Sequence, residues 1–563
     1  MGSKPSEHLQ NLRTQDLLYA GVFAVVLLVQ LWKARQGMGY SDEQFYVTIG
    51  KRFALGDRMF ADDWHIAQMI GFFLTPLYEL YTAVHGGTDG ILLGFRHYYV
   101  ALTMFTGLMI YLRFRKEGPA SILASLLYLV FTPFQIMSLS YNTMGAAAVI
   151  LAMLVYPMEG RHPFRFYLCG ILMACAVVNT PYLFFLYVIL TIITIRKPAW
   201  FSRSAWKGIT AGALTIAAVF LMVLWQSGSF ENFSESLSHL IDPSHQMTFF
   251  EMAVRNGGRL YLLFSFFLVV FAAELILTFV FLKDPQKEQK LSSCSLWINL
   301  CSMGYAVFVS GYQMESGTYA ALLIPLCLSG LQELLRKKRN DLLMIYGVSV
   351  FYALMISLSS NVGPSSFCSP LILAGSVSCL AFGSEKWNQI LAAAVVSVFA
   401  FYKCSYVFGA RISGCDTEIA DGPLKGLLDS AENVSQYERR LEDIREINAM
   451  EECSSVSLIT GQSWEYLACT KQIAANSTYL YFWEKDQYTA AEDAYACLHE
   501  DRYPAYVYVD HTDSHYFYEP EDSWLDQFAF VKDMHEGKLY IRDRSTISCA
   551  GRQNDEDPVC SYR

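Results

Sequence analysis

The chain has 563 residues, of which 53% are hydrophobic and 15% aromatic, while only 17% are charged. Soluble domains usually carry about 25% charged residues, so this composition excludes an ordinary soluble protein, and the length excludes a single compact domain. The charge divides the chain. Residues 1–409 hold 28 Lys and Arg against 22 Asp and Glu, and residues 410–563 hold 14 against 30. An acidic second part argues against nucleic acid as a partner, because phosphate contacts need a basic face.

Apolar segments recur along the first 409 residues. A membrane helix needs about 20 mostly apolar residues, and several of these segments are somewhat shorter. They cover residues 17–33, 97–112, 119–138, 143–158, 165–181, 183–195, 208–226, 259–282, 293–311, 318–335, 341–358, 367–382 and 387–408. The sequence therefore predicts a polytopic α-helical membrane protein with about 13 transmembrane helices.

Basic residues gather in alternate loops, for example at 113–116 and 336–339. Such loops stay on the cytoplasmic side, so we predict a multi-pass protein of the plasma membrane with a cytoplasmic N-terminus. An odd number of spans then puts the C-terminal part outside. Two long loops, 34–96 and 227–258, also lie outside, and the first contains an apolar, proline-broken segment at 66–84 that we expect to lie at the membrane interface.

Residues 410–563 have the pattern of a separate domain. Residues 424–452 are amphipathic, and apolar runs then alternate with helical stretches. We expect strands at 455–459, 478–483, 505–509 and 538–542, and helices at 463–473, 488–499 and 522–530. This alternation predicts an extracytoplasmic soluble α/β domain with a small parallel sheet. No Gly-rich phosphate loop follows these strands, so the pattern gives no support to a nucleotide site.

The stretch Ser41-Asp42-Glu43-Gln44-Phe45-Tyr46 follows the first span directly. Two carboxylates at a membrane surface are costly, and a carboxylate placed there is suited to act as a general base on an acceptor hydroxyl. The same pattern is typical of a helix N-terminus, with Ser41 as N-cap and acidic residues in the first turn. On the local pattern both interpretations stay open.

A second acidic cluster lies further along the same loop. Asp62 and Asp63, with His65 beside them, could hold a divalent cation, the one cofactor that the sequence suggests. Acidic residues solvated in a loop are the alternative explanation.

Outer basic residues are scarce. An anionic lipid-linked substrate would need some of them to bind its phosphate oxygens, whereas each one taken alone is explained by a side chain that reaches the lipid headgroups. The candidates are Arg58, Arg96, Arg255 and Arg259. Arg96 is the most informative, because it opens a span from the outer side.

In the order of its motifs, the sequence resembles the multi-pass GT-C glycosyltransferases that use polyprenyl-phosphate sugars, the group of protein O-mannosyltransferases and aminoarabinose transferases. The resemblance rests on Asp42-Glu43 with Tyr46, on the proline-containing interfacial segment, and on the approach Gly90-Ile-Leu-Leu-Gly-Phe-Arg96 to the second span. The phrases Asp-Glu-x-Phe-Tyr, Trp-His-x-x-Gln and Ser-Tyr-Asn-Thr are similar to an uncharacterised bacterial branch. The resemblance covers about residues 15–410.

The resemblance implies an inverting transfer of a sugar from a polyprenyl-phosphate donor to a hydroxyl of a glycan, lipid or protein acceptor, in glycan biosynthesis at the cell envelope. Asp42 would be the base, and Glu43 would orient the acceptor or hold an ion. The implied substrate-binding residues are Tyr46, Arg58, His65, Gln68, Arg96, Tyr141, Asn142, Arg255 and Arg259. The sequence departs from the family at Phe45, at His65 to Gln68 and at Asn142, which affects the donor contacts more than the base.

A transporter or flippase of a lipid-linked or envelope glycan precursor is the alternative function. Such proteins usually carry polar groups within their spans and show internal repeats. Here the predicted spans are nearly free of ionisable residues, the polar residues lie in the outer loops, and no repeat is visible. The sequence therefore favours the enzyme.

Overall fold

The computed structural model describes residues 5–39, 41–156, 163–196, 203–230, 316–359, 368–383, 386–407, 410–479, 503–510 and 525–542, with scattered residues in 233–305 and 491–499. The helices are α1 (Pro5–Ala34), α2 (Ser41–Ala54), α3 (Gly71–His85), α4 (Ile91–Phe114), α5 (Pro119–Val130), α6 (Tyr141–Val155), α7 (Pro163–Asn179), α8 (Phe184–Arg196), α9 (Arg203–Gln226), α13 (Ser316–Arg336), α14 (Asn340–Ser359), α15 (Cys368–Phe382), α16 (Lys386–Ser405), α17 (Ala431–Ala449) and α18 (Trp464–Ala468). The strands are β1 (Tyr406–Val407), β2 (Ala410–Arg411), β3 (Thr417–Glu418), β4 (Leu428–Asp429), β5 (Ser455–Ile459), β6 (Gln472–Ile473), β7 (Tyr506–Asp510), β8 (Phe528–Asp533) and β9 (Gly537–Arg542).

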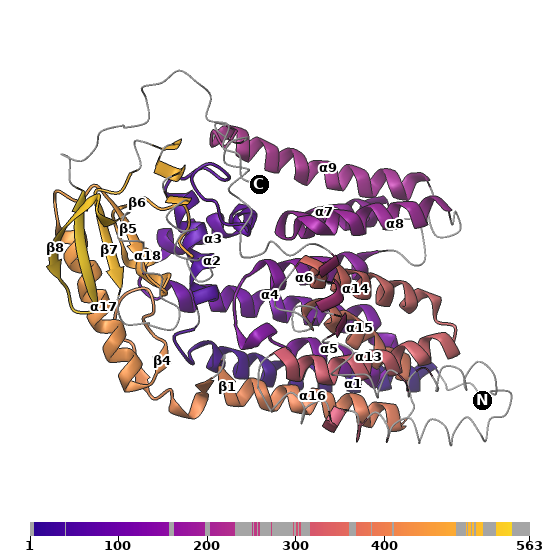
Figure 1. The fold of residues 1–563 in the computed structure, drawn as a ribbon. Coiled ribbons are helices and arrows are strands. Elements are labelled where there is room, and N and C mark those ends of the chain that lie inside the picture. Colours follow the sequence, from indigo (N-terminus) through magenta and orange to yellow (C-terminus); the bar gives the residue numbers. More distant parts are fainter. Residues whose placement is uncertain are drawn as a thin grey trace.

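Most of the described chain consists of apolar helices arranged in a bundle (Figure 1). Within the described residues, four helical stretches are long and apolar enough to cross a membrane, namely Leu12–Ala34, Ala205–Gln226, Asn340–Ser357 and Asn388–Ser405, and shorter apolar helices accompany them. The chain is therefore a polytopic membrane protein. Each predicted span within these residues overlaps a helix, although the span 119–138 is helical only to Val130, whereas 259–282 and 293–311 lie almost wholly outside the described residues.

The break between α5 and α6 shortens the predicted span 119–138. Thr132 precedes Pro133, and a residue before proline favours extended backbone, so the chain leaves the helix at Phe131. The next helix begins with a capping box, in which Ser140 Oγ accepts from Thr143 N at 3.2 Å and Thr143 Oγ1 accepts from Ser140 N at 2.9 Å. The phrase Ser-Tyr-Asn-Thr is thus a helix start.

The C-terminal residues form a five-stranded sheet in the order β6-β5-β7-β9-β8. Strand β5 runs parallel to β6 and β7, but β9 pairs antiparallel with both β7 and β8, so the sheet is mixed rather than parallel as predicted. The predicted helix at 522–530 is wrong for residues 528–530, which belong to the strand Phe528–Asp533 paired with β9, while residues 522–524 lie outside the described residues. The predicted strand at 478–483 lies mostly outside the described residues.

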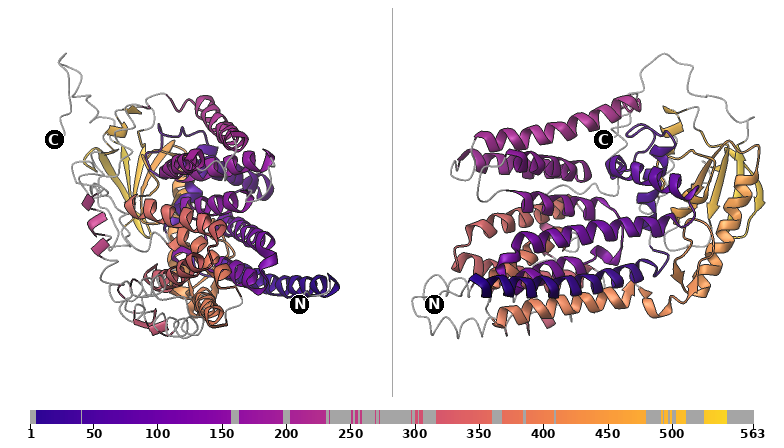
Figure 2. Two further views of the ribbon diagram at one scale, coloured as in Figure 1. Left: turned by 90° about the vertical axis from the view of Figure 1, so that its right-hand side faces the viewer. Right: turned by 180° about the vertical axis from the view of Figure 1, so that it is seen from behind.

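Helices α2 and α3 lie between the bundle and this sheet, at the end of the bundle opposite the N-terminus (Figures 1 and 2). One hydrophobic core joins them to the C-terminal residues, since Leu74 and Tyr81 of α3 belong to the same buried cluster as Leu427, Tyr437 and Trp464. Most of the apolar segment 66–84 thus forms helix α3, which packs against the C-terminal part.

The buried lysine Lys51 of α2 also contributes to this contact. Lys51 Nζ donates to the carbonyl oxygens of Tyr466 at 2.9 Å and Leu467 at 3.2 Å, and to that of Cys469. Burial lowers the pKa of Lys51 to about 8. A cation so placed satisfies carbonyls at the end of α18 that have no helical partner of their own.

Replacing this lysine should weaken the contact. Lys51→Met keeps the aliphatic length but leaves buried carbonyls without a donor, a loss of about 1–3 kcal/mol. We expect a lower unfolding temperature in detergent and faster proteolysis of the C-terminal residues. Lys532→Met is the matched control, because Lys532 forms an exposed pair with Glu446, and such pairs contribute little. Equal unfolding temperatures for the two variants would contradict the docking role of Lys51.

Candidate functional site

The predicted acidic pair opens α2, which begins at Ser41, with both carboxylates in its first turn. Asp42 is half-buried, and its Oδ1 accepts a hydrogen bond from the Tyr479 hydroxyl at 2.5 Å. Burial raises the pKa of Asp42 above its usual value, and the bond from Tyr479 partly offsets this. Asp42 is therefore a carboxylate of increased basicity.

Aromatic side chains surround Asp42. The Phe45 ring lies 4.5 Å from the His65 ring and 4.6 Å from the Tyr479 ring, centroid to centroid. On another side, the rings of Tyr46 and Tyr141 meet edge-on at 6.2 Å, and both hydroxyls interact electrostatically with Asp42. The structure thus brings together Asp42, Tyr46, His65 and Tyr141 from the predicted site.

Glu43 points to a different partner. Its two carboxylate oxygens accept from Arg96 Nε at 2.6 Å and Nη2 at 2.8 Å, and both side chains are buried. Arg96 Nη1 also donates to the carbonyls of Ala34 at 2.9 Å and Gln36 at 3.0 Å. Arg96 therefore ties the end of α1 and the start of α2 to α4.

The link between α1 and α2 is shaped by this pair. Gly39 has a φ of +82°, and a Cβ there would lie 2.3 Å from Glu43 Oε2 and 2.9 Å from Arg96 Nη2. Only glycine accommodates both the left-handed backbone and the close approach.

Two further lysines lie at the ends of α1 and α16. Lys33 Nζ donates to Gln135 Oε1 and to the Tyr406 carbonyl, both at 2.8 Å, and Lys403 Nζ donates to the Leu129 carbonyl at 3.0 Å. Both lysines are buried, and among the described residues neither has a carboxylate partner. Lys33 also interacts electrostatically with the side chains of Lys403 and Arg96.

A hollow exposes part of this group. Its lining includes Lys33, Gln36, Glu43, Arg96 and Gln135. Arg96 already pairs with Glu43, the carboxylate of this lining, so Lys33 has no carboxylate partner there. An anion bound there would stabilise the charged form of Lys33.

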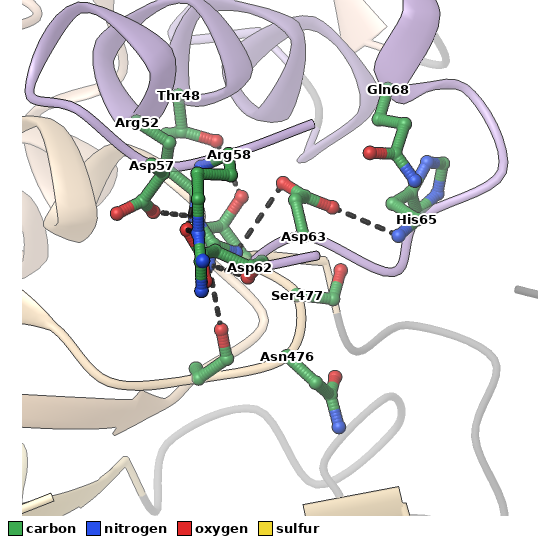
Figure 3. A network of polar contacts seen from close by, with 12 residues as sticks. Thr48, Arg52, Asp57, Arg58, Asp62, Asp63, His65, Gln68, Asn476 and Ser477 are labelled. Carbon is green, nitrogen blue, oxygen red and sulfur yellow. Dashed lines mark hydrogen bonds and ion pairs between the residues drawn. The ribbon is translucent and has the colours of Figure 1, made fainter. Parts of the chain in front are cut away.

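The other predicted loop residues form a separate network (Figure 3). Asp62 pairs with Arg58, whose Nη2 lies 3.0 Å from Asp62 Oδ1, and Asp63 Oδ2 lies 3.3 Å from Arg52 Nη1. Arg52 also bonds Asp57 at 2.6 Å, and burial, which alone would lower its pKa, is outweighed by Asp63 and Asp57, so the pKa of Arg52 is raised.

Within the described residues no group of three or more His, Cys, Asp or Glu side chains could hold a metal ion. The cation expected at Asp62 and Asp63 stays a prediction, in a place where the structure pairs both carboxylates with arginines. Gln68 Oε1 accepts from the Phe60 amide at 2.5 Å.

The remaining predicted residues are less informative. Asn142 is half-buried in the first turn of α6, beside Tyr141. Arg255 is a half-buried helical residue, and Arg259 lies outside the described residues.

Sequence reasoning missed Lys33, Lys403 and Tyr479. The two lysines carried the signal that singled out Arg96, a basic residue at the outer end of a span. Tyr479 carried none, because its contact with Asp42 joins residues 437 positions apart.

A family model described as a domain of unknown function (DUF6311) matches residues 95–252. No curated protein matches the sequence.

Three solved structures are similar to the chain. ArnT from Cupriavidus metallidurans in the apo state is 11% identical with a TM-score of 0.42, and covers 94% of this chain and 98% of its own. ArnT from the same organism bound to undecaprenyl phosphate is 12% identical with a TM-score of 0.40, and the match covers 94% of this chain and 98% of the ArnT chain. The archaeal oligosaccharyltransferase AglB from Archaeoglobus fulgidus, with an inhibitory peptide and a dolichol-phosphate, is 12% identical with a TM-score of 0.49, and covers 95% of this chain and 75% of its own.

The buried ion pair of α2 and α4 is open to a direct test. Arg96→Met leaves Glu43 charged, buried and without its cation, which should destabilise the protein by about 3–5 kcal/mol. Adding Glu43→Gln removes that charge, so the double variant should recover part of the unfolding temperature. A double variant no more stable than Arg96→Met would show that the pair is not the origin of the loss.

Proposed function

We propose that this chain is a membrane glycosyltransferase that transfers a sugar from a polyprenyl-phosphate donor to an acceptor hydroxyl at the outer face of the membrane. The observation that carries the proposal is Asp42, a half-buried carboxylate of raised pKa with one oxygen held by Tyr479, between the apolar bundle and the C-terminal domain. A base for a hydroxyl acceptor needs these properties, and a lipid-linked donor requires this boundary.

In the proposed reaction, Asp42 takes the proton of the acceptor hydroxyl as the acceptor oxygen attacks the anomeric carbon. The bond from that carbon to the phosphate oxygen breaks, and the phosphate leaves with the electron pair. The products are the glycosylated acceptor and the polyprenyl phosphate, and the proton passes from Asp42 to water. Attack from the face opposite the phosphate inverts the anomeric centre. The main tasks of the protein are then orientation and charge stabilisation.

Basic side chains near Asp42 support an anionic donor. Lys33 and Arg96 line one hollow with Glu43, the neighbour of Asp42 in the first turn of α2, and Lys403 acts electrostatically on Lys33. We assign the donor phosphate to this group rather than to Arg58, which is paired with Asp62. A phosphate there would accept charge-assisted hydrogen bonds.

A second hollow supports a lipid-linked substrate. It is lined by residues of α4, α5, α6 and α15, among them the apolar Leu102, Phe131 and Ile372 and the polar Thr103, Asn142 and Ser369. Its apolar residues suit contact with one end of a prenyl chain.

Asp42→Asn tests the base. Removal of a general base costs roughly 10²- to 10⁴-fold in rate, so transfer of radiolabelled sugar from polyprenyl-phosphate donors to envelope acceptors should fall by that factor with the unfolding temperature unchanged. Glu418→Gln is the control, since it neutralises an exposed carboxylate paired with Arg35. An Asp42→Asn variant with full activity would falsify the assignment, and precursor movement across vesicles without transfer would favour a flippase.

Lys33→Met and Lys403→Met test the donor site. A hydrogen bond to a charged group contributes about 1.5–3 kcal/mol, so each variant should bind undecaprenyl phosphate roughly 10- to 150-fold more weakly. Lys425→Met is the control, because Lys425 lies on the surface near Asp89. Unchanged binding in both buried-lysine variants would place the phosphate elsewhere.

A further inference from the structure

Tyr479 reaches Asp42 from a segment that runs along α2. Arg52 Nη2 donates to the Ala475 carbonyl at 2.9 Å, and the Trp64 amide donates to the Asn476 carbonyl at 2.8 Å. The hydroxyls of Thr48 and Thr478 share a hydrogen bond of 2.5 Å. Helix α2 and its following loop therefore hold the residues directly before Tyr479.

The C-terminal domain holds the same segment from its other side. Ser463 Oγ donates to the Thr478 carbonyl at 2.8 Å, and the Tyr479 amide donates to Ser477 Oγ at 3.1 Å. Just beyond Ser463, the Trp464 amide donates to Gln44 Oε1 of α2 at 3.2 Å. These bonds fix the backbone of Tyr479 relative to both α2 and the domain.

The Tyr479 ring is also fixed. It is buried at 7% exposure, packs against Phe45, and meets His65 edge-on with ring centroids 5.6 Å apart. A hydroxyl on a ring held in this way has little freedom, so its direction toward Asp42 is set before any substrate binds.

We propose that Tyr479 is a positioning residue for Asp42, so that the C-terminal domain completes the catalytic centre. This inference rests on the proposed function. The Tyr479 hydroxyl occupies Oδ1 and fixes the plane of the carboxylate, and within the described part of the chain Oδ2 accepts no hydrogen bond. Oδ2 is then the oxygen that faces the acceptor hydroxyl.

The same bond has an electrostatic effect. Burial raises the pKa of Asp42, which would leave a larger fraction of the base protonated in acid, and the Tyr479 hydroxyl opposes this because it stabilises the charged form. Only the ionised carboxylate takes a proton. Tyr479 therefore sets the lower limit of the pH range over which the base is active.

Tyr479→Phe tests the inference, because it removes the hydroxyl and keeps the packed ring. The pKa of Asp42 should rise further, so the acid limb of the pH–rate profile should move to higher pH by about one unit. We expect kcat to fall roughly 10-fold, with KM for the polyprenyl-phosphate donor and the unfolding temperature unchanged.

Two matched variants separate this role from a general effect on the domain. Tyr503→Phe removes a tyrosine hydroxyl of the same domain that bonds Gln527, and should leave kcat and the pH profile unchanged. Thr48→Val removes the bond to Thr478 but keeps the Tyr479 hydroxyl, so its acid limb should stay at the wild-type pH.

The outcomes are distinguishable. If Tyr479→Phe retains the wild-type kcat and pH profile while Asp42→Asn is inactive, the positioning role is overturned and the glycosyltransferase stands. If Tyr479→Phe loses activity only together with its unfolding temperature and with no shift of the acid limb, its role is structural and the inference is again overturned. An active Asp42→Asn variant removes both proposals.

Discussion

The first turn of α2 is held between two groups that approach it from different parts of the chain. The guanidinium of Arg96 binds Glu43 with two hydrogen bonds and reaches the last turn of α1, while Tyr479 binds Asp42 from the C-terminal domain. Neighbouring carboxylates thereby acquire different properties. Glu43 is paired with a buried cation, whereas among the described residues Asp42 accepts only from the neutral Tyr479 hydroxyl, as the proposed base requires. This difference between the partners of Glu43 and Asp42 underlies the rest of the candidate site.

The two groups of basic residues near α2 also differ in whether carboxylates pair with them. Arg52 and Arg58 are matched by the carboxylates of Asp57, Asp62 and Asp63, so this network requires no further ligand. Lys33 and Lys403 are buried, and the described residues offer them carbonyl and amide oxygens but no carboxylate. Burying a cation in this way is costly unless an anion joins it. The first group is therefore suited to hold the loop in place, and the second to hold a substrate.

Much of the helical part was predictable, because an apolar run of sufficient length specifies a membrane helix without reference to the remainder of the chain. The start of α2, the apolar helix α3 and the strand Ser455–Ile459 followed from local pattern. The antiparallel addition of β8 and β9 did not, since Phe528–Asp533 becomes a strand only by pairing with β9. Local propensity is a weak guide where a distant partner decides the structure.

The candidate site shows the same division. Asp42 and Arg96 were found from their positions at the ends of predicted spans. The sequence could not show that Glu43 would take Arg96 as its partner, or that Tyr479 would reach Asp42, because both depend on contacts between distant segments. Lys33 and Lys403 were within reach of the same reasoning that singled out Arg96, since each ends an apolar span on the predicted outer side.

The docking of Lys51 has a consequence for biogenesis. Its carbonyl partners begin at Tyr466, 415 residues further along the chain, so α2 is synthesised long before they exist. Domains generally fold in the order in which they emerge from the ribosome. Until the residues up to Tyr479 have been made, Lys51 lacks its acceptors and the first turn of α2 lacks the Tyr479 hydroxyl. The first turn of α2 therefore reaches its final arrangement late in biogenesis, and a chain that stalls before Tyr479 never acquires it.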